Sequence, residues 1–560
     1  MNHRLARFSD RGRGSVFRSE GDAIRRDRPQ RPDLGGRSTV YGMRGAVACE
    51  HPSAALAGLR VLDAGGNAAD ACVAMAACMA VLSPMATGMG GDAFLLFYEA
   101  DTGRIVGANG SGGAPREATI EKVRDRGVAE IPERGPLAVT VPGAVRLWED
   151  AANSLGVLPF ARLLEPAWEF AENGHPVAEV VARYWEAGVN LLRKNEAASA
   201  TFLPDGHPPV AGTRFTQADL AGTISAVAEG GADTFYNGEI ARRMARAVQY
   251  AGGYLSEDDL AAHETLWVEP ISTDYRGHQV YEIPPPGQGI AALEMLNILE
   301  GYDMASLGAA SAERIHLEAE VKKLAYQDLY QEIGDPEFWE HAEIPTQRLI
   351  SKEYAETLRA RISPDRASGR VAEPALGEDT TYLCAVDENG NGCSFINSLY
   401  MGFGSGIVAG GTGVILQNRG TSFELDPVHP NSLAPEKRPL HTIIPGLVTK
   451  EGALWAVFGN MGGPMQPQGH TQVIGNLVDH GMNAQEAVDH PRHFHGGYTL
   501  LVEGRIGWEE IQKLKNLGHE VEVGADYVVP VGGAQVIRVH EDGVRDAGSD
   551  PRKDGCALAQ

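Results

Sequence analysis

Residues 379–420 read DTTYLCAVDENGNGCSFINSLYMGFGSGIVAGGTGVILQNRG, and the expected fold is built around this stretch. Apolar residues alternate with others over 382–386 and again over 393–399, with Asn389-Gly390 between the two runs. This period and this turn predict a β-hairpin. A glycine-dense loop follows at 402–413. Residues 361–379, in front of the hairpin, have no periodicity and contain several prolines and glycines, which predicts an exposed linker that ends at Asp379.

The rest of the chain mixes helical and strand patterns without regular βαβ alternation. The expected helices lie within 51–82 (two segments) and 218–262, and at 145–152, 160–172, 177–192, 290–299, 312–330, 471–479 and 484–488. The expected strands lie at 93–98, 105–108, 280–283, 454–458 and 535–539. This order favours an α+β fold in which stacked antiparallel sheets are flanked by helices.

Composition limits the classes of function. The chain has 560 residues, enough for two large layers or domains, and its hydrophobic and charged fractions of 43% and 22% are ordinary for a globular enzyme. A net charge of -25 argues against nucleic acid and against an anionic membrane as partners. The charge-free run at 71–91 is interrupted by Pro84, so we expect a buried core helix rather than a membrane span.

The N-terminal residues and the cysteines bear on the compartment. Residues 1–36 are rich in Arg, Asp, Gly and Ser, which predicts a disordered tail with neither the apolar segment of a signal peptide nor the acid-poor composition of a transit peptide. The six cysteines show no CxxC pair and no metal-ligand spacing, as expected for small buried hydrophobes in a reducing compartment. We therefore expect a cytoplasmic protein.

Three familiar motifs carry little weight in this sequence. Glycine pairs at 402–406 and 411–413 lack the strand–loop–helix setting of a dinucleotide site. No G-x-S-x-G nucleophile elbow is present. The histidines of 490–495 lack partner ligands at helical spacing, so solvated loop histidines are favoured over a metal site.

Thr380 is the candidate nucleophile. A threonine at the start of a strand is usually structural, but here a linker ends directly before it. Cleavage before Thr380 would place its hydroxyl beside its own α-amine, whose pKa near ~8 lets it accept the hydroxyl proton. Gly462 and Gly463 offer successive backbone N–H groups that could hold an oxyanion, each worth about 3 kcal/mol. A plain turn after the preceding strand explains the two glycines equally well.

Ten stretches resemble, in order, the γ-glutamyltranspeptidase family of N-terminal-nucleophile hydrolases across about residues 38–560. They are HPSAALAGLRVLDAGGNAADA, TGMGGDAF, AVTVPGAV, EPISTDYRG, PPPGQG, DTTYLCAVDENGN, FGSGIV, KRPLHTIIP, MGG and GSDPRKDG. The resemblance implies an αββα sandwich made as a proenzyme that cleaves itself between Asp379 and Thr380. It implies a large subunit of residues 37–379 and a small subunit of residues 380–560 that stay associated, and it leaves open a homodimer of such pairs.

The resemblance also assigns roles to single residues. Thr380 would be the nucleophile in processing and turnover, and its freed amine would be the base. Ser398 falls where the family has a second hydroxyl near that amine, and Gly462 and Gly463 match its oxyanion pair. No cofactor and no metal are implied.

The substrate-binding positions depart from the glutathione-cleaving members of the family. Ser111 stands where those members have an arginine for the substrate α-carboxylate. The other departures are His441 and Thr442 in place of two serines, and Tyr400, Arg419 and Ser422 in place of groups that hold the α-amine. These positions are therefore expected to bind an α-amino acid head group weakly, because its α-ammonium group would lie against the Arg419 cation.

Arg419 suits a carboxylate, which a guanidinium grips through two hydrogen bonds, and His441 or Tyr400 could add another. A salt bridge from Arg419 to Asp387 or Glu424 is the structural alternative. The pattern resembles the oxamate amidohydrolase and cephalosporin (glutaryl-amide) acylase branches more than the glutathione hydrolases.

We therefore expect a self-processing threonine amidohydrolase whose partner is a small amide that carries a carboxylate. A genuine γ-glutamyltransferase or glutathione hydrolase is the main alternative. A non-catalytic binding protein on the same fold is an alternative of another class.

Overall fold

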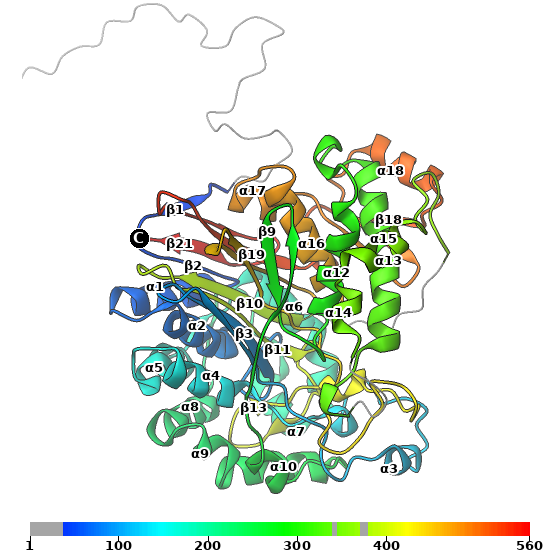
Figure 1. Ribbon diagram of the computed structural model, residues 1–560. Helices are drawn as coiled ribbons and strands as arrows, with labels where there is room; N and C mark the ends of the chain where they lie inside the picture. The colour runs from blue at the N-terminus through cyan, green and yellow to red at the C-terminus, as the bar shows by residue number, and fades with distance from the viewer. Residues whose placement is uncertain (1–36, 339–343, 370–378) are drawn as a thin grey trace, which may run out of the picture.

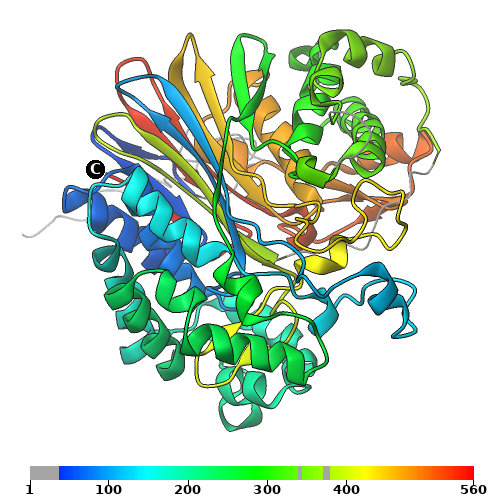
Figure 2. The ribbon, with the colours of Figure 1, turned by 60° about the horizontal axis from the view of Figure 1, so that its bottom comes forward.

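The computed structural model describes residues 37–338, 344–369 and 379–560. Two seven-stranded antiparallel sheets face each other at its centre, and helices cover the outer side of each (Figures 1 and 2). This arrangement confirms the expected α+β class of stacked antiparallel sheets between helices. The predicted N-terminal tail, residues 1–36, lies outside the described residues.

Both sheets combine strands from before and after Thr380. The first sheet has the order β1 (Val40–Gly42), β20 (Arg545–Ser549), β19 (Gly533–Val539), β15 (Ala453–Met461), β14 (Gly446–Lys450), β9 (His278–Glu282) and β8 (Ile271–Tyr275). The second has the order β21 (Cys556–Ala559), β2 (Ala46–Cys49), β10 (Asp379–Val386), β11 (Gly392–Tyr400), β3 (Asp92–Glu99), β4 (Arg104–Asn109) and β7 (Leu266–Val268). The two halves of the chain are thus interleaved and do not form separate domains.

The predicted hairpin is β10–β11, at the centre of the second sheet. The two strands pair antiparallel, and Gly390 in the connecting turn has a φ of +87°, which glycine adopts without strain. On their outer edges, β10 pairs with β2 and β11 pairs with β3. Backbone hydrogen bonds of one sheet therefore hold the segments before and after Asp379 together.

The start of the hairpin differs from the expectation. Strand β10 begins at Asp379, the last residue of the predicted linker, and Thr380 is only 1% exposed. Residues 361–369 of that linker are mostly exposed and contain no strand, as expected, and residues 370–378 lie outside the described part of the chain. Apolar alternation cannot show this, because Thr380 and Thr381 are polar and are nevertheless buried. A junction inside a sheet is a poor substrate for a separate protease, which needs exposed chain.

Tyr382 lies in the core between the two sheets. Its ring is fully buried, its hydroxyl is 2.8 Å from Ser394 Oγ, and its N–H donates to Glu50. A side chain at Gly459 on the facing sheet would come within 2.4 Å of the ring. Tyr382 therefore has a packing role, which the sequence did not reveal.

Helices α1 (Pro52–Asp63), α2 (Ala68–Leu82), α4 (Ala144–Ser154), α5 (Phe160–Asn173) and α8 (Ala218–Gly230) cover the second sheet. Every residue of α2 is buried, as its apolar sequence predicts, and an Asn67–Asp70 capping box fixes its start. No helix in the described part of the chain is long and apolar enough to cross a membrane. The six cysteines are free thiols, and five of them are buried, as expected.

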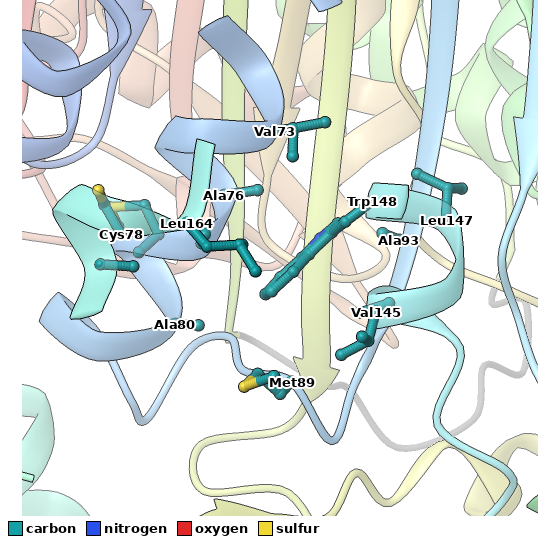
Figure 3. Packing of buried hydrophobic residues seen from close by; sticks show 14 of the residues in the cluster. Val73, Ala76, Cys78, Ala80, Met89, Ala93, Val145, Leu147, Trp148 and Leu164 are labelled. Atoms are coloured by element: carbon teal, nitrogen blue, oxygen red, sulfur yellow. The ribbon is translucent and has the colours of Figure 1, made fainter. Parts of the chain in front are cut away.

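Trp148 of α4 joins this helical layer to the hairpin. Figure 3 shows its ring among small and branched side chains of α2 and its neighbours, including Val73, Ala76 and Leu164. Its indole Nε1 donates a hydrogen bond of 2.9 Å to Asn397 Oδ1 on β11. Trp148 thus fixes the residue next to Ser398.

Trp148→Phe is expected to lower the free energy of unfolding by about 2–4 kcal/mol. The change leaves the buried Asn397 oxygen without its donor and removes part of the packed ring. Thermal unfolding measures the effect as a fall in Tm. Trp267→Phe on β7 is the matched control, since Trp267 is 42% exposed and should shift Tm little. Equal shifts in the two variants would contradict the role of the indole hydrogen bond.

Helices α12 (Gly289–Glu300), α13 (Ala312–Glu332), α16 (Met465–Val478) and α17 (Ala484–Asp489) form the opposite layer. Helix α16 begins at Met465, earlier than the predicted 471. The histidines of 490–495 were expected to be solvated, and this is wrong: His490, His493 and His495 are each less than 5% exposed, and the last two lie on β16 (His493–Gly496). Burial keeps the pKa of all three below the usual range, so they are neutral.

Candidate active site

Thr380 and Ser398 meet on adjacent strands of the second sheet. Thr380 Oγ1 lies 3.0 Å from Ser398 Oγ, and both side chains are buried. Ser398 Oγ also accepts the N–H of Tyr400 at 2.8 Å. The structure therefore brings the predicted nucleophile and the predicted second hydroxyl into direct contact.

The hairpin is irregular at this point. Asp379 pairs with Tyr400 and Thr381 pairs with Asn397, so β11 has one more residue than β10 between these pairs. Tyr400 has a φ of +79°, a conformation that side-chain-bearing residues rarely adopt. Bulges and left-handed residues of this kind concentrate at functional sites because they redirect side chains. Here the irregularity places Ser398 Oγ against Thr380.

Gly91 makes room for the end of β11. A Cβ atom at this position would lie 2.3 Å from the carbonyl oxygen of Ser398, so only glycine fits. Gly91 belongs to the TGMGGDAF stretch. The close approach of the Ser398 carbonyl explains why this position of the stretch is a glycine.

Arg419, which begins a short 3-10 helix (Arg419–Ser422), lies beside the two hydroxyls. Its Nη2 donates to Ser398 Oγ at 3.4 Å and its Nη1 donates to Thr442 Oγ1 at 2.6 Å. The guanidinium stacks on the Tyr400 ring, with its central carbon 4.2 Å from the ring centroid. Burial lowers the pKa of Arg419 to about 10, so it remains a cation at neutral pH.

No salt bridge satisfies Arg419 among the described residues. Its Nε is buried without a hydrogen-bond partner, and no carboxylate lies within 4 Å of its nitrogens. Neither carboxylate suggested as a partner pairs with Arg419: Asp387 accepts from Asn389, Asn391 and Ala68, and Glu424 is exposed. The salt-bridge alternative is therefore wrong, and the cation is held mainly by neutral groups.

Asp92 is the nearest source of negative charge, and sequence reasoning missed it. It begins β3, and its carboxylate accepts hydrogen bonds from Gln417, His441 and two backbone N–H groups. Burial raises the pKa of Asp92 to about 7, with Arg419 acting in the opposite direction. The position of Asp92 next to the TGMGG glycines was the available signal.

His441 supports Asp92 and does not face the cavity. Burial and the Arg419 charge keep the pKa of His441 well below its usual range, so the ring is neutral. Its Nε2 lies 2.9 Å from Asp92 Oδ2 and its Nδ1 accepts the N–H of Ile443. Both ring nitrogens are thus occupied, which leaves none for the substrate hydrogen bond that the sequence suggested.

Gly462 and Gly463 lie between β15 and α16. Their φ values are +129° and +56°, and their carbonyl groups accept the N–H groups of Met465 and Gln466. Among the described residues, neither glycine N–H donates a hydrogen bond. Two successive donors are therefore left available, and the oxyanion role of the pair stays a prediction.

Gln288 connects these glycines to the Arg419 group. Its side-chain amide donates to the carbonyl groups of Gly463 and Thr442, at 2.8 and 2.6 Å. Gln288 comes from the PPPGQG stretch, and sequence reasoning gave it no role. Hydrogen bonds thus link Thr380, Ser398, Arg419 and the Thr442 hydroxyl, and Gln288 joins the Thr442 backbone to that of Gly463.

A cavity of about 410 Å³ opens against this group. Of the sequence-predicted residues, Tyr400, Ser422 and Thr442 line it, and Gln288 and Pro464 line it as well. Three acidic side chains, Glu130, Glu133 and Glu424, also belong to its wall. The cavity thus has an acidic outer part, while the Arg419 cation lies behind Tyr400 and Thr442.

Ser111 is not brought into this group by any contact. It is fully buried, its hydroxyl donates to Asn109 Oδ1 at 2.7 Å, and its carbonyl oxygen accepts from Arg438 Nε. It does not line the cavity. Ser111, which the family resemblance placed among the substrate-binding positions, therefore bonds to Asn109 at the end of β4 instead.

Comparisons with known proteins show which family and which solved structures this chain is similar to. The family model described as gamma-glutamyltranspeptidase matches residues 54–560. A glutathione hydrolase-like YwrD proenzyme of Bacillus subtilis is 41% identical, covering 93% of this chain and 99% of that protein. An oxamate amidohydrolase proenzyme of Klebsiella pneumoniae is 35% identical, with the same coverage. The crystal structure of a cephalosporin acylase from Bacillus halodurans is 41% identical, has a TM-score of 0.88, and covers 96% of this chain and 99% of that one.

Proposed function

This chain belongs to the gamma-glutamyltranspeptidase family, and from that premise we propose that it is a self-processing threonine amidohydrolase for small amides that carry a carboxylate. Like its relatives, it is an enzyme with the N-terminal-nucleophile hydrolase fold. The observation that carries the proposal is the buried contact of Thr380 Oγ1 with Ser398 Oγ, beside an arginine that forms no ion pair with a described carboxylate.

Processing is the first step of the proposal. The Thr380 hydroxyl attacks the carbonyl carbon of Asp379, the C–N bond of that peptide breaks, and the nitrogen takes the proton. This break frees the Thr380 amine and leaves Asp379 as an ester on Thr380 Oγ. Water then hydrolyses the ester, which restores the Thr380 hydroxyl and leaves a carboxylate on Asp379. Burial of Thr380 within β10 supports an intramolecular reaction, and the shared sheet supports continued association of the two subunits.

Turnover uses the same hydroxyl. Thr380 Oγ attacks the substrate amide carbon while the freed amine takes its proton, and the N–H groups of Gly462 and Gly463 hold the oxyanion. The C–N bond breaks, the leaving amine takes that proton, and an acyl ester remains on Thr380. Water, activated by the same amine, releases the acid and restores the hydroxyl.

Arg419 supports the carboxylate part of the proposal. A buried cation without an anionic partner is costly, and a substrate carboxylate close to Thr442 and Tyr400 would offset that cost. The acidic wall of the cavity suits the amine side of the substrate, which leaves as a base. The similarity to an oxamate amidohydrolase and to a cephalosporin acylase supports a substrate other than a γ-glutamyl compound.

A substrate panel tests the proposal. Purified, fully processed protein is expected to turn over oxamate or a glutaryl amide with a kcat/KM at least ~10-fold above that for γ-glutamyl-p-nitroanilide. The physical reason is that an α-ammonium group close to Arg419 costs at least ~1.4 kcal/mol in transition-state binding. Good turnover of the γ-glutamyl compound alone would overturn this preference.

A genuine γ-glutamyl hydrolase is the second candidate, and one observation favours it. Glu130, Glu133 and Glu424 line the cavity and could accept an α-ammonium group at a position away from Arg419. The glutathione hydrolase-like name of the Bacillus subtilis relative points the same way. The substrate panel decides between the two.

A further inference from the structure

A second cluster of chemically active side chains lies in the helical layer outside the first sheet. Within the described residues, His316, Glu320 and His519 each offer one ligand atom, and these three atoms lie within 4.8 Å of one another. All three residues are buried. His316 and Glu320 belong to α13, and His519 follows α18 (Trp508–Asn516), which packs beside α13 (Figure 1).

His316 is oriented as metal-binding histidines commonly are. Its Nε2 lies 2.8 Å from the carbonyl oxygen of Ser363, which can only accept, so this nitrogen carries the hydrogen. Its Nδ1 therefore presents a lone pair, and His519 Nε2 lies 2.8 Å from it. A carbonyl on the far nitrogen fixes both the tautomer and the ring orientation of a ligand histidine.

Glu320 is placed one helical turn after His316, so both side chains leave the same face of α13. Its Oε1 accepts from Lys323 at 2.6 Å and its Oε2 accepts the N–H of Ser368 at 2.9 Å. Each carboxylate oxygen keeps a further lone pair for a metal ion, and carboxylates that bind metals are themselves commonly hydrogen-bonded in this way.

We propose that His316 Nδ1, Glu320 and His519 Nε2 bind one divalent transition-metal ion of the zinc class. Two imidazoles and a carboxylate are a common zinc ligand set, and tetrahedral ligands about 2 Å from the ion lie roughly 3.3 Å apart. The two histidine nitrogens need to separate by only about half an ångström to admit the ion between them. A water molecule from an adjoining cavity of about 190 Å³, which His519 and Lys323 line, completes the coordination.

The site would connect segments from both sides of Thr380. His316 and Glu320 precede the proposed cleavage point, and His519 follows it. Ser363 and Ser368, which orient two of the ligands, lie in the segment just before the undescribed residues 370–378. The ion would therefore clamp the two subunits together. This clamp role rests on the proposed cleavage, whereas metal binding itself does not.

Metal titration tests the site. Tag-free protein is stripped with a chelator and titrated with Zn²⁺ against a chromophoric competitor, and the visible spectrum of Co²⁺-loaded protein is recorded. Wild-type protein is expected to bind one equivalent. Glu320→Gln and His519→Gln are expected to bind about 100-fold more weakly or worse, and Lys323→Met more tightly because a competing cation is removed. His207→Gln, which changes an exposed histidine, is the matched control and should bind as wild type.

Thermal unfolding provides a readout that does not depend on activity. Zn²⁺ is expected to raise Tm in wild type and in His207→Gln, but not in His519→Gln. Circular dichroism of each metal-free variant checks that it is folded. Absence of stoichiometric binding by wild type would overturn the proposal and leave a plain His316–His519 hydrogen bond. Equal binding by wild type, Glu320→Gln and His519→Gln would overturn it as well.

Discussion

Thr380→Ala is expected to remain a single chain of 560 residues and to lose amidase activity by a factor on the order of 10⁴ or more. The change removes the hydroxyl that forms both proposed esters, and no other described hydroxyl replaces it. Ser398 Oγ, its hydrogen-bond partner at 3.0 Å, lies on the neighbouring strand. Denaturing gel electrophoresis measures processing, and N-terminal sequencing of the small fragment from wild type should read Thr-Thr-Tyr-Leu.

Thr381→Val is the matched control for this experiment. Thr381 is the next residue of β10 and is equally buried, and its hydroxyl has no hydrogen-bond partner in the structure. Valine keeps the side-chain shape, so processing and activity should be close to wild type. Thr380→Ser, which keeps a hydroxyl, should process slowly. Normal cleavage of Thr380→Ala, or an intact wild-type chain in fresh and aged preparations, would contradict the mechanism and support a non-catalytic binding protein.

Arg419→Met is expected to lower kcat/KM for carboxylate-bearing amides by roughly 10²–10³-fold, equivalent to about 3–4 kcal/mol. The change removes the cation that we propose to receive the substrate carboxylate. For a neutral amide of the same size the loss should stay below about tenfold, because Arg419 then contributes only through Ser398 and Thr442. Steady-state kinetics on the two substrates, with processed enzyme, measures the difference.

Arg419→Lys separates charge from geometry. Lysine keeps the cation but not the planar fork that bonds Thr442 and Ser398 together, so it should recover part of the loss for the charged substrate alone. If Arg419→Met reduced both substrates equally, Arg419 would be a positioning residue for Ser398 and not a carboxylate receptor. That outcome would contradict the proposal of a carboxylate-bearing substrate, and it would leave the proposed role of Thr380 as nucleophile unchanged.

The local sequence pattern predicted the type and position of most helices and strands. Alternation and the Asn389-Gly390 turn predicted β10–β11, and continuous apolar character predicted the buried α2. These features depend on neighbours in sequence, which period and turn chemistry report directly. The polar start of β10 was missed because its burial depends on Ser398, which lies in another strand.

The residues of the candidate site could be identified from the sequence, but the contacts between them could not. The sequence and its family resemblance determined the identity of Thr380, Ser398, Arg419 and the glycine pair as candidates. Only the tertiary structure decided that Arg419 bonds Ser398 and Thr442, that His441 turns to Asp92, and that Ser111 bonds Asn109. It also decided that His519 meets His316 across 203 residues of chain. Such contacts follow from how the sheets and helical layers stack, and residue spacing along one sequence carries no record of that stacking.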